Sequence, residues 1–224
     1  HTGYVTAHAR ELALHLKLDE QDAGLAELTG LLHDVGRFRQ WQLYKTFVDA
    51  QSEDHADLGV KVIRELPFFG KLTEADREVL LFAIGNHNKK EIQQTNSKRK
   101  LLFARLIRDA DKLDIFRVLE DQVGHTDWRG DSRAFWNLAV SAPPNPVVVA
   151  NIERCEPVDY QNIRSLSDFV LIQVGWMISG LHFATTRRLC RERNHLAFRR
   201  DFLHQLTDSP AIDCVCDMAA RVLV

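Results

Sequence analysis

The sequence predicts an all-α protein. Apolar residues recur at helical spacing along most of the 224 residues, and residues that favour helix starts stand before several of these runs. Strand candidates are few, and residues 147–149, three consecutive valines, form the only short one. We therefore predict a helical bundle.

The predicted helices of the N-terminal half begin at recognisable signals. Ser52 is the expected N-cap of a helix that ends at Pro67, and Thr73 with Asp76 resembles a capping box. The expected helices cover residues 1–18, 21–33, 52–66, 73–87 and 101–119. Residues 68–70 form a turn between two of them.

Two polar or aromatic segments separate these helices. Residues 37–51 are predicted to be irregular, and their aromatic side chains either pack over the core or form a wall of a substrate cleft. Residues 89–100 are basic, and form either a solvated loop or a rim that attracts a phosphorylated substrate.

The C-terminal half is less regular at its start. Residues 124–165 are predicted to be a connection or a loop that covers a cleft, with prolines at the centre. Further helices are expected over residues 167–189 and 194–206, and a last one follows Ser209, with Pro210 in its first turn.

Composition excludes several classes of protein. The formal charge of −2 provides no broad electrostatic attraction to nucleic acid or membrane, so we expect neither partner. The longest apolar run, residues 169–181, is too short and too interrupted to span a bilayer. Without a visible signal peptide the expected location is the cytoplasm, where the 4 cysteines are reduced.

One helix end carries a His-Asp pair. His33 and Asp34 follow an apolar run and precede Gly36, and an imidazole beside a carboxylate can bind a divalent ion. Taken alone, the pair fits equally well a helix end whose histidine bonds a carbonyl and whose aspartate faces water. The metal hypothesis depends on further residues elsewhere in the chain: His1, His55, His87 and Asp111.

These residues lie in motifs that occur in a known order. The motifs are His1-Thr2 and residues 31–38, 54–59, 83–88 and 108–114. Together they resemble the HD-domain superfamily of metal-dependent phosphohydrolases, in particular its compact bacterial members. The resemblance implies an HD-domain helical bundle with its metal site at converging helix ends, extended by C-terminal helices. On this basis we divide the chain into a metal-binding core, residues 1–124, and an extension, residues 125–224, that packs on it within a single domain.

The resemblance also implies a ligand set for one or two divalent ions, Mn²⁺, Fe²⁺, Co²⁺, Ni²⁺ or Mg²⁺. Asp34 would bridge the two ions. The first ion would be held by His1, His33 and Asp111, and the second by His55 and His87. Two alternatives stay open: His8 in place of His1, and binding of substrate phosphate rather than metal by His55 and His87.

Three further residues are candidates for the substrate site. We place Arg37 with Asp34 in the catalytic site, because a guanidinium can hold two phosphate oxygens. Lys112 is a second phosphate candidate, or else pairs with Asp109 or Asp114. Asn88 would orient substrate or water, or cap a helix end. Four other histidines match no motif and are expected to be structural or exposed: His125, His182, His195 and His204.

The predicted function is hydrolysis of a phosphate monoester or diester, with a nucleotide as the default substrate, by a metal-activated water. Some superfamily members with the same ligand pattern are di-iron oxygenases, which is the first alternative. A non-catalytic regulator that binds a nucleotide is the second. The oligomeric state is not predicted by the sequence.

Overall fold

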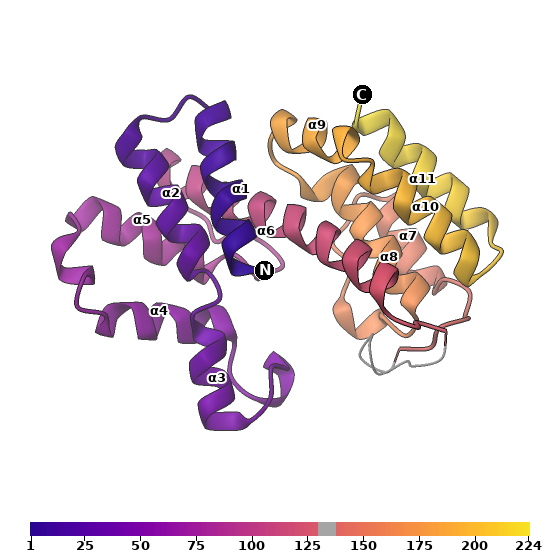
Figure 1. The fold of residues 1–224 in the computed structure, drawn as a ribbon, viewed down its shortest axis with the longest axis horizontal. Coiled ribbons are helices and arrows are strands. Elements are labelled where there is room, and N and C mark those ends of the chain that lie inside the picture. The colour runs from indigo at the N-terminus through magenta and orange to yellow at the C-terminus, as the bar shows by residue number, and fades with distance from the viewer. Residues whose placement is uncertain (130–137) are drawn as a thin grey trace. The chain divides into compact units, whose positions relative to one another are not determined.

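The computed structural model describes residues 1–129 and 138–224 (Figure 1). Within these ranges the elements are helical, and the one extended pairing is an isolated bridge between Ala139 and Ser165. The all-α prediction is therefore confirmed for the described part of the chain. Two compact units are present, His1–Asp114 and Ile115–Val224. The packing of residues 125–224 on the core stays a prediction.

The first two helices of unit 1, α1 (Thr2–His15) and α2 (Glu20–Leu32), lie against each other (Figure 1). Asp19 caps α2 by accepting a hydrogen bond from the Asp22 backbone. Their backbones approach closely near Gly30, where an added Cβ would lie 2.8 Å from the Cα of Thr6. Only glycine permits this approach, which brings the end of α2 close to the start of α1.

Helix α3 (Gly36–Tyr44) corrects the prediction that residues 37–51 are irregular. Its buried residues are Gly36 and Gln40, so no apolar stripe marks it as a helix. It ends at Lys45, which adopts the left-handed conformation. A short connection follows and contains a 3₁₀ turn at Asp49–Gln51, with Val48 before the turn in an extended conformation.

Two short helices of unit 1, α4 (His55–Glu65) and α5 (Glu74–Gly85), follow α3. Helix α4 is capped by Asp54, not by Ser52 as predicted, because the Asp54 carboxylate accepts from two backbone amides of the first turn. Helix α5 is capped by Thr73 as predicted. The capping box is only half formed, since the Asp76 carboxylate accepts from the Thr73 hydroxyl instead of its backbone.

Helix α6 (Lys98–His125) is longer at both ends than the predicted 101–119. Its first half belongs to unit 1 and its second half to unit 2. Residues of the first half that contact the core include Phe103, Ile107 and Leu113, all fully buried. Their spacing places Asp111 on a neighbouring face, toward the ends of the shorter helices.

Unit 2 continues with α7 (Pro146–Glu153), α8 (Leu166–Gly175), α9 (Ala184–Glu192), α10 (His195–Leu206) and α11 (Pro210–Val222) (Figure 1). The strand expected at residues 147–149 is wrong, because Asn145 caps a helix there and Pro146 takes its first position. The single helix expected over residues 167–189 is also wrong, since a π-helical segment at Trp176–Gly180 separates α8 from α9. The helix after Ser209 is confirmed, although the Ser209 side chain makes no capping bond.

The core of unit 2 contains an ion pair. Arg199 is fully buried, and its guanidinium donates to Glu120, to the Gln173 side chain and to the Phe116 carbonyl. His195 also donates to Glu120, so it is one of the structural histidines expected from the sequence. None of the helices in the described ranges is long and apolar enough to cross a membrane.

Candidate metal centre

The His-Asp pair occupies the short connection between α2 and α3. Helix α2 ends at Leu32, and the next helix begins at Gly36. The His33 ring is buried at this junction, and the Asp34 carboxylate is partly exposed. Gly36 makes the junction possible: an added Cβ would lie 2.0 Å from the His55 carbonyl oxygen. The start of α3, directly after the His-Asp pair, is thereby held against the start of α4.

The buried rings of His33 and His87 are oriented by backbone carbonyls. The His33 Nδ1 donates to the carbonyl of Gly30 at 2.8 Å, and the His87 Nδ1 donates to that of Ile84 at 2.7 Å. A carbonyl oxygen can only accept, so the proton must be on Nδ1 in both rings. Each neutral ring then presents the lone pair of its Nε2, the form that binds a metal.

Carboxylates orient the other two rings in the same sense. The His55 Nδ1 lies 2.7 Å from an oxygen of Asp49, and the His1 Nδ1 lies 2.7 Å from an oxygen of Asp114. Asp114 is fully buried. An ionised carboxylate accepts hydrogen bonds only, so these rings also present Nε2. Carboxylate–histidine pairs of this kind fix ligand orientation in metal sites.

The first group of converging atoms comes from His1, His33 and Asp111. The Nε2 atoms of the two histidines are 3.3 Å apart, and the Asp111 Oδ1 lies 3.2 Å from the first and 3.7 Å from the second. Ligands about 2.1 Å from one ion are roughly 3.0–3.4 Å from each other. Two of the three separations lie in this range and the third, at 3.7 Å, is slightly longer, so the group approaches the geometry of ligands around a single divalent ion.

The second group comes from His55, His87 and Asp34. The two Nε2 atoms are 3.0 Å apart, and the Asp34 Oδ1 lies 3.4 Å from that of His55 and 3.6 Å from that of His87. Two Nε2 lone pairs at this distance repel each other unless a proton or a cation lies between them. A divalent ion satisfies both rings and the carboxylate together.

Asp34 connects the two groups. Its Oδ1 faces His55 and His87, and its Oδ2 lies 3.7 Å from the His33 Nε2 and 3.9 Å from the His1 Nε2. One carboxylate thus directs one oxygen to each group. A third cluster, formed by Asp49, Asp54 and His55, uses the opposite edge of the His55 ring.

Burial and charge set the protonation of these residues. Burial lowers the pKa of His33 and of His55, which keeps both rings neutral near pH 7. Burial opposes the ionisation of Asp34, but the surrounding imidazoles, His87 first and then His33 and His55, outweigh burial and hold the pKa of the carboxyl far below its usual range. The pKa of Asp111 is lowered in the same way, against burial, by its hydrogen bond with His1.

His1 differs from the other rings. Burial would lower its pKa, but hydrogen bonds with Asp111 and Asp114 outweigh that effect and raise the pKa to about 10. In the metal-free protein the ring is therefore a cation between two carboxylates. A divalent ion at the first group has to replace the proton on Nε2.

The three predicted substrate residues differ in what their side chains contact, and the Lys112 ammonium donates to the Arg108 carbonyl of its own helix. One edge of the Arg37 guanidinium, Nη1, donates to the Phe47 carbonyl at 2.7 Å, and Nε lies 3.6 Å from the Asp34 Oδ1. Asn88 donates to Asp54 at 3.0 Å, while its Oδ1 is buried and has no hydrogen-bond partner. Burial, with the charge of Arg108, lowers the pKa of Lys112 to about 8.

The basic segment 89–100 is largely neutralised by ion pairs. Lys89 pairs with Asp54 and Asp57, Arg99 pairs with Asp22 and Asp76, and Lys100 pairs with Glu78. These contacts fasten the segment to α2, α4 and α5. They favour the interpretation of a structural loop over that of a phosphate-attracting rim.

Two carboxylates of the centre were not assigned to it from the sequence. Asp114 was considered only as a partner of Lys112, although it lies three residues after Asp111 and so on the same face of α6. That spacing is a signal that could have identified it. Asp49 lies in a segment without periodicity, and no sequence pattern marks it.

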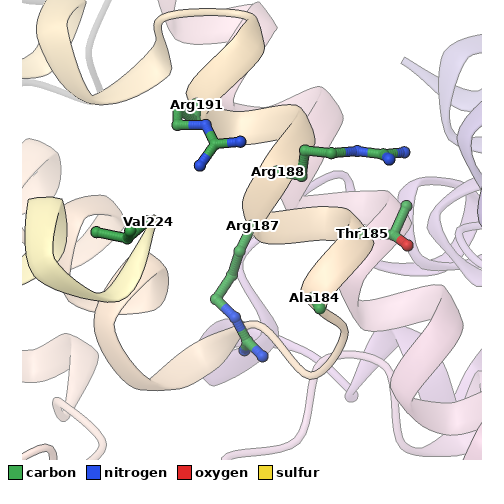
Figure 2. A pocket seen from close by; sticks show the side chains of 6 residues that line it. All are labelled: Ala184, Thr185, Arg187, Arg188, Arg191 and Val224. Carbon is green, nitrogen blue, oxygen red and sulfur yellow. The ribbon is translucent and has the colours of Figure 1, made fainter.

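A separate groove lies in unit 2, between α9 and the end of α11 (Figure 2). Three arginines line it, and each has a partner: Arg187 donates to the Leu181 carbonyl, Arg191 donates to the Leu223 carbonyl, and Arg188 lies 3.6 Å from Glu192. Figure 2 shows these side chains directed to different sides. The groove contains no predicted site residue.

Unit 1 is all-helical and brings together two His/Asp groups of a kind that can hold a metal ion. The chain belongs to the HD domain family, whose pattern it matches over residues 1–115. The resemblance inferred from the sequence is thereby confirmed. Members of this family are typically metal-dependent phosphohydrolases. No curated protein and no solved structure matches the chain significantly.

Proposed function

We propose that this protein is a metal-dependent phosphohydrolase that cleaves a phosphate monoester or diester, with a nucleotide as its substrate. The observation that carries the proposal is the Asp34 carboxylate, which directs one oxygen to each of two groups of histidine Nε2 atoms. The family match supports the same reaction class.

The donor atoms suit one or two divalent ions. His1, His33 and Asp111 would hold the first ion, His55 and His87 the second, and Asp34 would bridge them. Mixed nitrogen and oxygen ligands suit Mn²⁺, Fe²⁺, Co²⁺ and Ni²⁺, and Mg²⁺ is less well matched to imidazole. Such ions supply activation of water as a nucleophile and neutralise charge on phosphate oxygens.

The chain's own residues would position the ester. The Nε edge of Arg37 faces Asp34, so a phosphate at the centre would accept from this edge, while Nη1 stays bonded to Phe47. Lys112, one residue after a ligand, would add a second positive charge. The unpartnered Oδ1 of Asn88 would accept from a water or a substrate hydroxyl.

A phosphate-release screen tests the proposal. Nucleotides and sugar phosphates would be assayed with Mn²⁺, Co²⁺, Fe²⁺, Mg²⁺ and Ni²⁺ each supplied separately. We expect release with at least one ion, and its loss together with bound metal in Asp34→Ala. Turnover by Asp34→Ala at the wild-type rate would contradict the proposal. Oxygen consumption without phosphate release after anaerobic purification would indicate a di-iron oxygenase instead.

A further inference from the structure

Helix α3 and the segment after it expose large aromatic side chains. Trp41 is 48% exposed and Phe47 is 55% exposed, and their rings stack with centroids 5.1 Å apart and planes 20° from parallel. In Figure 1 this segment projects beyond α4. Soluble proteins rarely leave neighbouring large apolar side chains exposed unless they bind something. We call Trp41 and Phe47 the aromatic pair.

The aromatic pair lies beside the candidate metal centre. The Arg37 guanidinium donates from Nη1 to the Phe47 carbonyl, and its Nε faces Asp34. The Phe47 carbonyl and the Asp34 carboxylate therefore lie at opposite edges of one guanidinium. Trp41 follows Arg37 by four residues on α3 and therefore shares its face. A molecule with its phosphate at Asp34 and Arg37 would extend along this face toward the aromatic pair.

Hydrogen bonds of Gln40 hold the two segments that carry the aromatic pair. Gln40 is fully buried, and its amide donates to Asp49 at 2.8 Å and to the Ser52 hydroxyl at 2.9 Å. Its Oε1 accepts from Arg37. These bonds fix the segment after α3 to that helix, so the exposed rings are presented in one geometry before a ligand arrives.

We infer that the aromatic pair binds the planar organic group of the substrate, such as a nucleobase, by stacking. The inference rests on the proposed function, because it takes the phosphate of the same molecule to lie at the metal centre. An aromatic ring stacks on any base, so the pair would favour planar esters without selecting one base. A sugar phosphate would gain nothing from these rings.

Paired substrates and a binding measurement test this. With Mn²⁺-loaded protein, kcat/KM would be compared for adenosine 5′-monophosphate and glycerol 3-phosphate in wild type and in Trp41→Leu and Phe47→Leu. We expect each variant to lose about 5- to 150-fold on the nucleotide, the range for one lost stacking contact, and under about twofold on the glycerol ester. Leu43→Ala, an exposed apolar residue on α3 outside the aromatic pair, is the matched control and should change neither.

Tryptophan emission separates this inference from the proposed function. Adenosine 5′-monophosphate should quench the tryptophan emission of wild type but not that of the tryptophans that remain in Trp41→Leu. This result is expected even if no turnover is found, and bound metal should be the same in both proteins. Equal losses on both esters, or quenching that persists in Trp41→Leu, would overturn the stacking role. So would a wild-type dimer that becomes monomeric in the double variant, because a second copy would then cover the rings.

Discussion

Gly36→Ala is the substitution for which the structure predicts the largest effect from the smallest chemical change. The added Cβ would lie 2.0 Å from the His55 carbonyl oxygen and 2.5 Å from the Gly59 amide nitrogen. Both neighbours are backbone atoms, which cannot rotate away. Because van der Waals contact lies near about 3.5 Å, α3 and α4 must separate by more than about 1 Å.

This separation has two measurable consequences. Overpacking against backbone on both sides costs about 3 kcal/mol, which in a chain of this size lowers the Tm by about 6–12 °C. The metal centre is affected as well, because Asp34 lies before α3 and His55 begins α4. Ligand positions tolerate shifts of only about 0.2 Å, so the second ion should bind more weakly. Thermal unfolding and metal titration would be measured on the same preparation.

Gly24→Ala is the matched control. Gly24 lies within α2, and nothing lies within 4 Å of an added Cβ there. Alanine is the better helix former, so this variant should gain about 0.5–1 kcal/mol and bind metal normally. If Gly36→Ala unfolds at the wild-type temperature and binds metal like wild type, the packing of α3 on α4 described here is wrong.

Three further perturbations test other parts of the molecule. Arg37→Lys should keep bound metal but lower kcat/KM about 10- to 100-fold, because the ammonium loses the two-pronged geometry; wild-type kinetics would remove Arg37 from the site. Asp114→Asn should weaken the first ion about 10- to 100-fold, measured by chelator competition, because the carboxylate orients His1; unchanged affinity would make Asp114 a core residue only. In Glu120, burial raises the carboxyl pKa but the hydrogen bond of His195 and the contact with Arg199 outweigh it, so the folded pKa lies below the unfolded one. The stabilisation by Glu120 is therefore present above the unfolded pKa and is lost as pH falls through the folded one. The Tm of wild type should therefore fall more than that of Glu120→Gln between pH 6 and pH 3, and equal falls would contradict this.

Helices with an apolar stripe were predictable from the sequence, and the one without a stripe was not. The helices over α1, α2, α5 and α10 follow their buried residues closely. Helix α3 buries only Gly36 and Gln40, so its stability comes from hydrogen bonds to the following segment, which no periodicity reveals. The three valines of α7 suggest a strand because β-branched side chains favour strands. They form a helix instead, because Asn145 caps it and Pro146 takes its first position.

In the candidate site, too, the residues of local motifs were predictable, and the contacts between distant segments were not. The motif with His33 and Asp34 marks a helix end, whereas Asp111 lies within α6. The structure brings these three residues together with His1, His55 and His87. The carbonyl partners of the His33 and His87 Nδ1 atoms lie three residues earlier in the same helix ends and are local. The carboxylate partners of His1 and His55 were not predictable, since they come from segments that meet these rings only in the folded unit. Asp49 is the extreme case: it orients His55 from a segment that has no pattern of its own.

Metal stoichiometry is the most direct test of the two-group centre. Purified protein would be loaded with Mn²⁺, freed of excess ion and analysed for metal per chain, together with His87→Ala and Asp34→Ala. We expect about two ions in wild type, about one in His87→Ala, where only the second group is damaged, and neither ion firmly held in Asp34→Ala. Full metal content in Asp34→Ala would contradict the central role of its carboxylate, and one ion per chain in saturated wild type would reassign His55 and His87 to substrate phosphate.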